Sequence, residues 1–267
     1  MERKVFIYKN NSIESAETEK CLISKLKKCN FTITNTVDET NDLVVCIGGD
    51  GSLLAFLNKY DMPQVPIIGI NTGSLGFFQE INPDQIDFFL DNYQTGKFTI
   101  QTLHTVKARI NTKHGEVIQY GLNEIAIKSA NNFPLHLDLS IGGSPIERFS
   151  GSGLLVCTPA GSTAYNYSLG GSIVDPRIKM LQVTPIAPLN TTAYRSFTSS
   201  ILLPYDLRLG MRPTYNKKDT RIEIMHDGYS EIYDDIEGIN IFFSDKSVNL
   251  IRLYNYDFWS KVKSKFL

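Results

Sequence analysis

The sequence has little excess charge and no long apolar run. A formal net charge of -1 over 267 residues gives no general attraction for nucleic acid or an anionic membrane. Any phosphate binding must therefore come from a local site. No apolar stretch is long enough to span a bilayer, and the segment Met1 to Tyr8 lacks the apolar core of a signal peptide. These absences predict a cytoplasmic protein with neither a nucleic-acid nor a membrane partner.

Metal-ligand and hydrolase patterns are also missing. The four cysteines form no Cys-x-x-Cys pair, and Cys46 and Cys157 lie in apolar runs, which favours buried thiols over disulfides or a metal site. The four histidines are isolated, with no His-Glu-x-x-His spacing. Ser152 lacks the outer glycines of a nucleophile elbow. We therefore expect no protein-bound metal and no serine-hydrolase chemistry.

The most informative stretch present is Gly48–Ser52, which reads Gly-Gly-Asp-Gly-Ser. An apolar run precedes it, and apolar residues at helical spacing follow from Leu53 to Tyr60, which predicts strand, tight turn and helix. Glycines let a ligand approach the backbone, and a helix N-terminus offers N–H groups to phosphate oxygens. No Walker Gly-Lys-Ser/Thr follows. An ordinary Asp-Gly turn is the alternative, and the three glycines around Asp50 weigh against it.

The first hundred residues alternate between strand and helix patterns. Strands are expected at Val5–Tyr8, Phe31–Thr34, Leu43–Ile47 and Pro66–Ile70, and helices at Ile13–Lys28 and from Pro83 to about Gly96. This alternation predicts a Rossmann-like α/β domain over residues 1–100 with a largely parallel sheet. In such sheets ligands bind beyond the carboxyl ends of the strands, where Gly48–Ser52 and Asn71–Gly76 would lie.

The pattern changes after Phe98 to strand after strand. Strands are expected at Val106–Ile110, Val117–Tyr120, Glu124–Ile127, Leu135–Ile141 and Leu154–Cys157. Turn residues between them predict hairpins and an antiparallel, sandwich-like, all-β domain over residues 101–250. Apolar residues at helical spacing among lysines, from Phe258 to Leu267, predict that the tail 251–267 packs back on the first domain as a short amphipathic helix.

A second candidate site is the pair Asn123-Glu124 between two strand-like segments. An amide donates and accepts hydrogen bonds, whereas an ionised carboxylate only accepts, so the pair suits a polyhydroxyl ligand. Neighbouring strand residues face opposite sides of a sheet, so both can serve one ligand only at a strand end or a bulge. A solvated strand start is the simpler alternative for this pair.

A third candidate is the long segment Phe149–Gly171, in which a buried strand leads into small residues, then Tyr165 and two more glycines. Small side chains leave room for a planar group, hydroxyl and N–H groups supply directional bonds, and an aromatic ring offers a stacking face. This combination is typical of a nucleotide site. A glycine-rich loop in an all-β domain is the alternative.

These motifs together resemble the NAD kinase family. Gly48–Ser52 resembles its Gly-Gly-Asp-Gly-Thr, Asn71–Phe77 its Thr-Gly-x-Leu-Gly-Phe segment, Leu122–Glu124 its Asn-Glu pair, Thr158–Tyr165 its Thr-Pro-x-Gly-Ser-Thr-Ala-Tyr signature, and Phe258-Trp259 its aromatic tail. The first motif alone is not specific, because lipid kinases and phosphofructokinases share its Gly-Gly-Asp theme. All the motifs in this order are specific.

The resemblance implies phosphorylation of the 2′-hydroxyl of the adenosine ribose of NAD by ATP, giving NADP. It also implies Mg²⁺ or another divalent cation carried by the nucleotide, and a homodimer or homotetramer. By the same resemblance, Asp50 accepts the proton of the attacking hydroxyl, and Gly49, Gly51 and Ser52 hold phosphates. The residues implied to contact substrate are Phe77, Asn123, Glu124, Ser150, Ser152, Thr158, Ala160, Ser162, Thr163, Ala164, Tyr165, Ser168 and Ala187.

The chain departs from the family at Ser150-Gly151-Ser152-Gly153, where many members read Arg-Gly-Asp-Gly. Two hydroxyls replace a guanidinium and a carboxylate, so contacts to the nicotinamide end and across a subunit interface should differ. We expect weaker NAD binding than in members that retain both charges. Ser152→Asp should then lower the Michaelis constant for NAD, and an unchanged constant would contradict this interpretation.

Two alternatives belong to other functional classes. A lipid kinase of the diacylglycerol kinase type shares the glycine turn, but it predicts no dinucleotide signature after Thr158 and some membrane-facing surface. A non-catalytic nucleotide-binding protein, whose altered Ser150–Gly153 loop has lost catalysis, is the other alternative. The presence of Asp50 argues against it.

Overall fold

The computed structural model describes residues 3–74, 76–131, 133–192, 195–214 and 221–266. Leu75 of the second motif and Leu267 of the expected tail helix lie outside them. By compactness the chain divides into one unit of residues 1–103 and 247–267 and another of residues 104–246. Two long strands, β5 (Phe98–Thr112) and β15 (Ile236–Leu253), contribute residues to both units. None of the described helices is long and apolar enough to cross a membrane.

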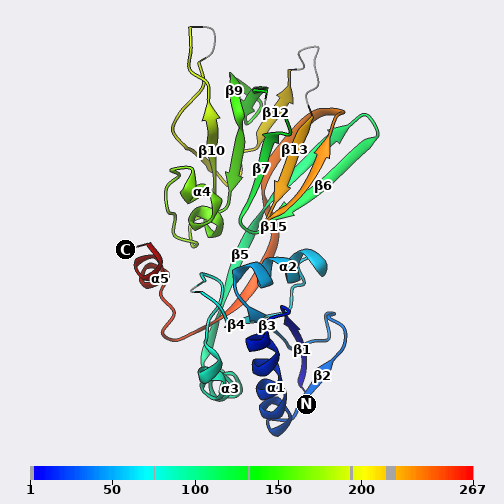
Figure 1. The fold of residues 1–267 in the computed structure, drawn as a ribbon, viewed down its shortest axis with the longest axis vertical. Coiled ribbons are helices and arrows are strands. Elements are labelled where there is room, and N and C mark those ends of the chain that lie inside the picture. Colours follow the sequence, from blue (N-terminus) through cyan, green and yellow to red (C-terminus); the bar gives the residue numbers. More distant parts are fainter. Residues whose placement is uncertain (1–2, 75, 132, 193–194, 215–220, 267) are drawn as a thin grey trace. The chain divides into compact units, whose positions relative to one another are not determined.

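The first unit is an α/β domain with a parallel sheet, as predicted (Figure 1). Its other elements are β1 (Arg3–Lys9), α1 (Ile13–Lys28), β2 (Phe31–Thr34), β3 (Leu43–Gly48), α2 (Asp50–Lys59), β4 (Ile67–Asn71), the 3₁₀ turn η1 (Pro83–Gln85), α3 (Ile86–Gln94) and α5 (Phe258–Phe266). The strands lie in the order β15-β4-β3-β1-β2, and these neighbours pair in parallel.

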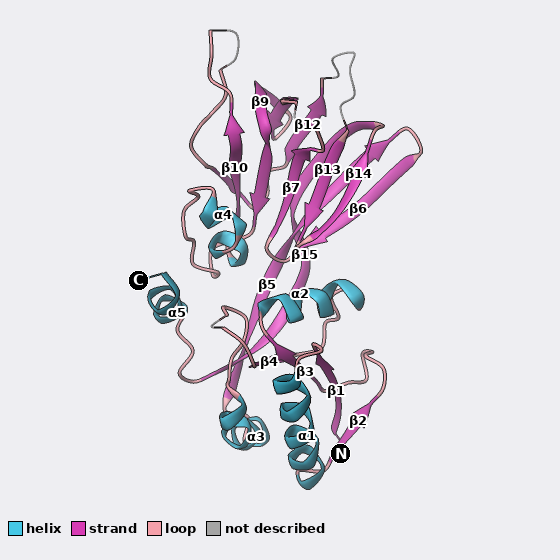
Figure 2. Ribbon diagram, in the orientation of Figure 1, coloured by secondary structure: helices cyan, strands magenta, loops and turns pink. Residues whose placement is uncertain are grey.

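Helices cover both faces of this sheet, with α2 on one face and α1 and α3 on the other (Figure 2). Strand periodicity explains the two layers, because successive side chains point to opposite faces. Val5 joins the core that contains Leu22 of α1 and Phe89 of α3. Its neighbour Phe6 instead packs against Phe56 of α2, with ring centroids 6.2 Å apart. The sheet is therefore buried on both faces, as its nearly continuous apolar strands predict.

The second unit is β-rich, which confirms the predicted fold class. Its elements are β6 (Gly115–Gly121), β7 (Glu124–Ser129), β8 (Leu135–Ile141), β9 (Ser144–Cys157), the 3₁₀ turn η2 (Ala160–Thr163), α4 (Tyr165–Ser168), β10 (Met180–Pro188), β11 (Ile201–Pro204), β12 (Leu209–Pro213), β13 (Ile222–His226) and β14 (Tyr229–Tyr233). Among the described residues of this unit, the strands pair in an antiparallel fashion. One apolar core, which includes Ile125, Phe149 and Ile241, holds these strands together.

The description of Ser150–Gly153 as a loop was wrong, because these residues lie inside β9. Both glycines are required by close strand packing. An added Cβ at Gly151 would lie 2.9 Å from the Ala187 carbonyl oxygen, and one at Gly153 would lie 2.2 Å from that of Ile127. The predicted hairpins are present. Gly142 and Gly143, both with positive φ, join β8 to β9.

Candidate active site

The Gly-Gly-Asp-Gly-Ser motif forms the predicted strand, turn and helix. β3 ends at Gly48, Gly49 caps α2, and Asp50 is the first helical residue. Gly48 has φ +147, and an added Cβ there would lie 2.0 Å from the Ser52 Oγ, so only glycine fits. Gly48 also pairs with Asn71 at the end of β4, which confirms that the two motifs meet at the carboxyl ends of neighbouring strands.

The Asp50 carboxylate is held by the segment that follows the second motif. Oδ2 accepts a 2.8 Å hydrogen bond from the Phe77 N–H, and Oδ1 accepts a 3.0 Å bond from the Phe78 N–H. Gly76 makes this approach possible, since an added Cβ would lie 2.3 Å from Oδ1. Each carboxylate oxygen can accept a further bond, so the group is oriented without being saturated.

The other candidate residues of this unit have different surroundings. Ser52 Oγ accepts a 3.3 Å bond from the Asn10 side chain and packs on Gly48, so it is already engaged within the protein. At Gly49 and Gly51 an added Cβ would meet no atom within 4 Å. These two glycines leave open space at the N-terminus of α2, where a ligand could approach the backbone. The Phe77 ring is buried and packs 5.8 Å from that of Phe258 in α5.

Asn123 and Glu124 lie at a strand end, the placement that lets both serve one ligand. Glu124 is the first residue of β7, and Asn123 precedes it. The turn is fixed by Asp227, whose Oδ2 accepts from Leu122 N–H at 2.6 Å and whose Oδ1 accepts from Asn123 N–H at 2.8 Å and Glu124 N–H at 3.3 Å. Sequence reasoning missed Asp227. The available signal was the dipeptide Asp227-Gly228, because Asp-Gly favours a two-residue hairpin turn. In the structure both residues have positive φ and form the loop of the β13–β14 hairpin.

Two buried polar atoms of this pair have no hydrogen-bond partner among the described residues. They are Asn123 Oδ1 and Glu124 Oε2. A buried polar atom without a partner costs about 1–3 kcal/mol, so native proteins pair nearly all of them. The alternative of a merely solvated strand start does not account for these atoms, because Asn123 is only 7% exposed. A polar ligand would supply the missing partners.

The surroundings of Glu124 favour its neutral acid form over the ionised form considered from the sequence. Burial raises its pKa to about 8, and the neighbouring Asp227 charge adds to the effect. A protonated carboxyl both donates and accepts hydrogen bonds. Asn123 and Glu124 together can therefore match either a donor or an acceptor on a bound sugar or base.

Glu124→Gln should stabilise the ligand-free protein increasingly as pH rises from 4.5 to 8. Across this window the folded protein keeps a proton on Glu124 that the unfolded chain releases, so wild-type stability falls with rising pH. Glutamine resembles the neutral acid and has nothing to release. The pKa of Glu124 rises from its ordinary value of 4.5 to about 8, and this difference corresponds to at most about 5 kcal/mol of unfolding free energy. Urea unfolding at several pH values measures the difference.

Glu237→Gln is the matched control, because Glu237 is an exposed residue of the same unit. Its unfolding free energy, measured at the same pH values, gives the effect of a Glu→Gln exchange at an exposed position. A parallel course for Glu124→Gln as well would mean that Glu124 ionises normally in the folded protein.

The Thr158–Tyr165 segment lies against this turn. Thr158 follows β9, donates its hydroxyl to the Leu122 carbonyl at 2.6 Å and donates its N–H to the Asn123 carbonyl at 2.9 Å. Gly161 packs on the same turn, where an added Cβ would lie 2.0 Å from Asn123 O. Buried Ser162 bonds Pro159 O and Val174 O through its hydroxyl. The structure therefore brings the second and third candidate sites together.

The remaining candidate residues of this segment differ in exposure. Ala160 and Thr163 are buried, Ala164 and Tyr165 are half-buried, and Ser168 is exposed. Sequence reasoning also missed a structural residue, buried Asn166, which donates to Ser162 O and Ser172 O and accepts from the Thr184 hydroxyl. Its amide thus links Ser162 to Ser172 across the loop that contains Tyr165.

Ser150 and Ser152, the two serines that replace charged residues of the family pattern, differ in solvent exposure. Ser150 is fully buried, and its Oγ lies 2.7 Å from His136 Nδ1. Ser152 is exposed. Ala187 is also exposed and has φ +43, a conformation that side chains other than glycine rarely adopt. Ser150 is thus a packing residue in this structure, whereas Ser152 is accessible to a ligand.

The described residues contain no group of three His, Cys, Asp or Glu side chains that could hold a metal ion. These residues therefore do not fit a preformed site for a divalent cation. Cys46 and Cys157 are buried free thiols, as predicted, while Cys21 is exposed and Cys29 is half-buried.

Two family models match this chain. Residues 5–98 match the ATP-NAD kinase N-terminal domain, and residues 122–253 match the ATP-NAD kinase C-terminal domain. Among curated proteins, the NAD kinase of Finegoldia magna is 34% identical over 264 residues, covering 98% of this chain and 97% of the relative. The NAD kinase of Streptococcus gordonii is 32% identical over 270 residues, which cover 100% of this chain and 96% of the relative.

Solved structures show the same fold. The yeast NADH kinase, crystallised with NADH, superposes with a TM-score of 0.83 at 19% identity, covering 98% of this chain and 86% of that one. An NAD kinase from Archaeoglobus fulgidus, crystallised with ATP, gives a TM-score of 0.76 at 22% identity, and the superposition covers 98% of this chain and 99% of that one. At these identities the likeness concerns the fold.

Proposed function

Because this chain belongs to the NAD kinase family of phosphotransferases, we propose that it transfers the terminal phosphoryl group of ATP to the 2′-hydroxyl of the adenosine ribose of NAD. The bond between the terminal phosphorus and its bridging oxygen breaks. A new bond forms from that phosphorus to the ribose oxygen, and the products are NADP and ADP. The hydroxyl must lose its proton as the new bond forms.

Asp50 is proposed as the base that takes this proton. Its carboxylate is oriented by two backbone N–H groups, and each oxygen keeps capacity for another hydrogen bond. Phosphoryl transfer depends mainly on positioning and charge stabilisation, so a fixed carboxylate suits it. Gly49 and Gly51 leave open space at the N-terminus of α2, where phosphate oxygens can meet backbone N–H groups. Ser52 is proposed to act beside them through its hydroxyl hydrogen, because its N–H already donates to the Gly49 carbonyl at 2.9 Å.

Asn123 and Glu124 are proposed to bind the adenine and ribose of NAD. The observation that carries this proposal is the pair of buried, unpartnered oxygens, Asn123 Oδ1 and Glu124 Oε2. A base amino group or a ribose hydroxyl would pair each of them. The half-buried ring of Tyr165 offers an adjacent apolar surface. Other members of the proposed binding surface are Thr158, Ala160, Thr163, Ala164, Ser168 and Ala187.

A divalent cation, proposed as Mg²⁺, would arrive with the phosphates of the nucleotide, because the described residues provide no site for it. When bound, it would neutralise phosphate charge. Assembly as a homodimer or homotetramer and a cytoplasmic location stay predictions from the family resemblance and the sequence.

A coupled assay tests the proposed function. Purified protein with NAD, ATP and Mg²⁺ should form NADP, detected by an NADP-specific dehydrogenase. Diacylglycerol in place of NAD should yield no phosphorylated lipid. Phosphorylation of the lipid alone would favour the lipid kinase. Binding of NAD without turnover, measured by calorimetry, would favour the non-catalytic nucleotide-binding protein.

A further inference from the structure

The segment Phe77–Gln79 connects the Asp50 turn to the C-terminal part of the chain. On its amide side, Phe77 and Phe78 donate to the Asp50 carboxylate, and Gln79 Nε2 donates to the Gly49 carbonyl at 2.9 Å. Three hydrogen bonds thus tie this segment to the turn that carries the proposed base. Whatever holds the segment also determines where that carboxylate lies.

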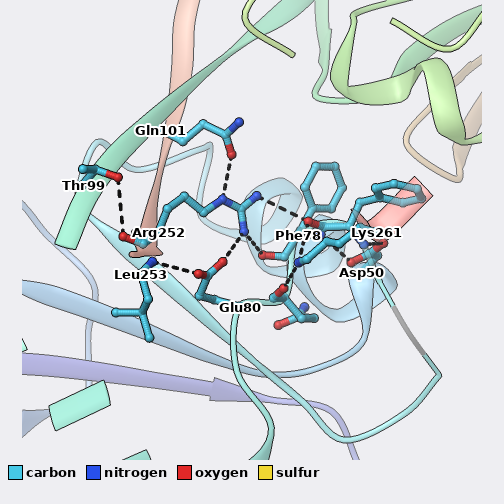
Figure 3. Close-up of polar contacts among 10 residues, drawn as sticks. Asp50, Phe78, Glu80, Thr99, Gln101, Arg252, Leu253 and Lys261 are labelled. Carbon is cyan, nitrogen blue, oxygen red and sulfur yellow. Dashed lines mark hydrogen bonds and ion pairs between the residues drawn. The ribbon is translucent and has the colours of Figure 1, made fainter. Parts of the chain in front are cut away.

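Two cations bind carbonyl oxygens of this segment, among them that of the Phe77–Phe78 peptide group, whose N–H donates to Asp50 (Figure 3). Arg252 donates from Nη1 to Phe78 O at 3.0 Å and from Nη2 to Phe77 O at 3.3 Å. Lys261 Nζ donates to Phe77 O at 3.2 Å and also to Gln79 O. A cation at the carbonyl of a peptide group polarises the neighbouring hydrogen bonds in a chain, which strengthens N–H donation to a carboxylate.

Arg252 is itself rigidly fixed. It is 3% exposed, pairs with Glu80 Oε2 at 2.9 Å, donates to Gln101 Oε1 at 2.7 Å and stacks 3.9 Å from the Tyr256 ring. Glu80 also accepts the Leu253 N–H at 2.8 Å. This network binds the end of β15 to the segment. Truncating Arg252 would leave Glu80 as an uncompensated buried charge.

Lys261 is the cation that packing alone does not require. It lies on α5, whose Phe258 and Phe266 rings already pack on the Phe77 ring with centroids 5.8 and 5.9 Å apart. Its ammonium is partly buried and bonds to carbonyl oxygens, which costs stability relative to an apolar side chain of the same length. A side chain that is costly to bury and aimed at this segment points to a role in the site.

We infer that Lys261, together with Arg252, is a positioning residue for the phosphoryl transfer, holding Asp50 in place through the Phe77–Gln79 backbone. This inference rests on the proposed function, in which Asp50 is the base. The apolar packing of α5 fixes the helix to the first unit, and the Lys261 ammonium orders the peptide groups that orient the carboxylate.

A double-variant cycle tests this coupling. The four proteins are the wild type, Lys261→Met, Asp50→Asn and the variant with both changes. Lys261→Met keeps the aliphatic stem, and we expect it to lower kcat about tenfold, the rate equivalent of one charge-assisted hydrogen bond. The Michaelis constants for NAD and ATP should change less than about twofold. In the Asp50→Asn background the same substitution should lower kcat by less than about twofold, since no base remains to position.

Equal losses in both backgrounds would overturn the inference, because a purely structural lysine acts without regard to Asp50. An unchanged kcat in Lys261→Met would overturn it too. Lys263→Met is the matched control, an exposed lysine of the same helix, and it should keep wild-type kcat. Failure of the proposed function has a different signature, namely no NADP from the wild type or full activity in Asp50→Asn.

A pH profile supplies a readout that packing would not move. The charged or titratable groups facing Lys261 are Arg252, Glu80, Asp50, Asp257 and Tyr256, whose ring centroid lies 5.2 Å from Nζ. Burial and, to a lesser extent, the Arg252 charge lower the pKa of Lys261 to about 8, against the opposing effect of Glu80 and Asp50. Wild-type kcat should therefore fall as pH rises through 8.

Lys261→Arg keeps a cation at every accessible pH, so its kcat should lack this descending limb. If both profiles fall together above pH 8, the limb belongs to another group and the inference fails. Should Lys261→Met not fold, Lys261→Gln, which keeps two donors without the charge, replaces it in the cycle. Thermal unfolding of each variant establishes that folded proteins are compared.

Discussion

Asp50→Asn should lower kcat for NADP formation by about 10²–10⁴-fold, the usual contribution of a general base. Asparagine preserves the shape of the side chain and can still accept one backbone N–H, but its amide cannot take a proton. The Michaelis constant for NAD should change little, because Asn123 and Glu124 are intact. Steady-state kinetics give kcat, and calorimetry with NAD alone measures binding.

The unfolding free energy of Asp50→Asn must be measured together with its kinetics, because the substitution also removes a hydrogen bond. The Asn amide would face the N–H of either Phe77 or Phe78 and lose that hydrogen bond, at a cost of about 1 kcal/mol in unfolding free energy. Such a loss is too small to unfold the protein at 25 °C. Asp84→Asn, an exposed aspartate on η1, is the control and should retain wild-type kcat. A near-normal rate in Asp50→Asn would show that Asp50 is not the base.

Much of the first unit could be predicted because its signals are local. The apolar run that ends at Gly48 and the helical spacing after Ser52 determine β3, the turn and α2 from about fifteen neighbouring residues. The hairpin of β8 and β9 has a similarly local signal in Gly142-Gly143, whose positive φ values need glycine. Local chemistry thus places the Asp50 turn at the carboxyl end of a parallel strand.

The elements from β10 to β15 could not be predicted in the same way. β15 runs continuously from Ile236 to Leu253, although Ser244–Ser247 reads as a polar turn. Its partners β12 and β4 come from distant parts of the sequence, so pairing outweighs local preference there. For the same reason the contacts of Arg252 and Lys261 with Phe77–Gln79, across more than 170 residues, have no signal in sequence spacing.

The candidate site shows the same division. The sequence predicted that Asn123 and Glu124 need a strand end to act together, because strand geometry alone demands it. It did not predict that burial raises the pKa of Glu124, since ionisation depends on the solvent that the folded chain excludes. It also did not indicate Asp227, which lies about 100 residues further along the chain.

Asp227→Ala should lower the unfolding free energy by about 3–5 kcal/mol, because two buried backbone N–H groups, of Leu122 and Asn123, and the partly buried one of Glu124 lose their acceptor. Alanine is also strained at φ +47, which adds about 1–2 kcal/mol within that total. With the turn released, Asn123 and Glu124 lose their fixed orientation. The Michaelis constant for NAD should therefore rise at temperatures where the variant is still folded. Urea unfolding and steady-state kinetics measure the two effects.

Asp227→Gly separates the carboxylate from the backbone conformation. Glycine adopts φ +47 without strain, so this variant loses only the acceptor and the rigidity of the turn. It should recover about 1 kcal/mol relative to alanine and remain well below the wild type. Wild-type stability in the glycine variant would mean that strain accounts for the whole effect. A destabilised glycine variant with a raised Michaelis constant for NAD would instead identify the Asp227 carboxylate as the group that builds the Asn123-Glu124 turn.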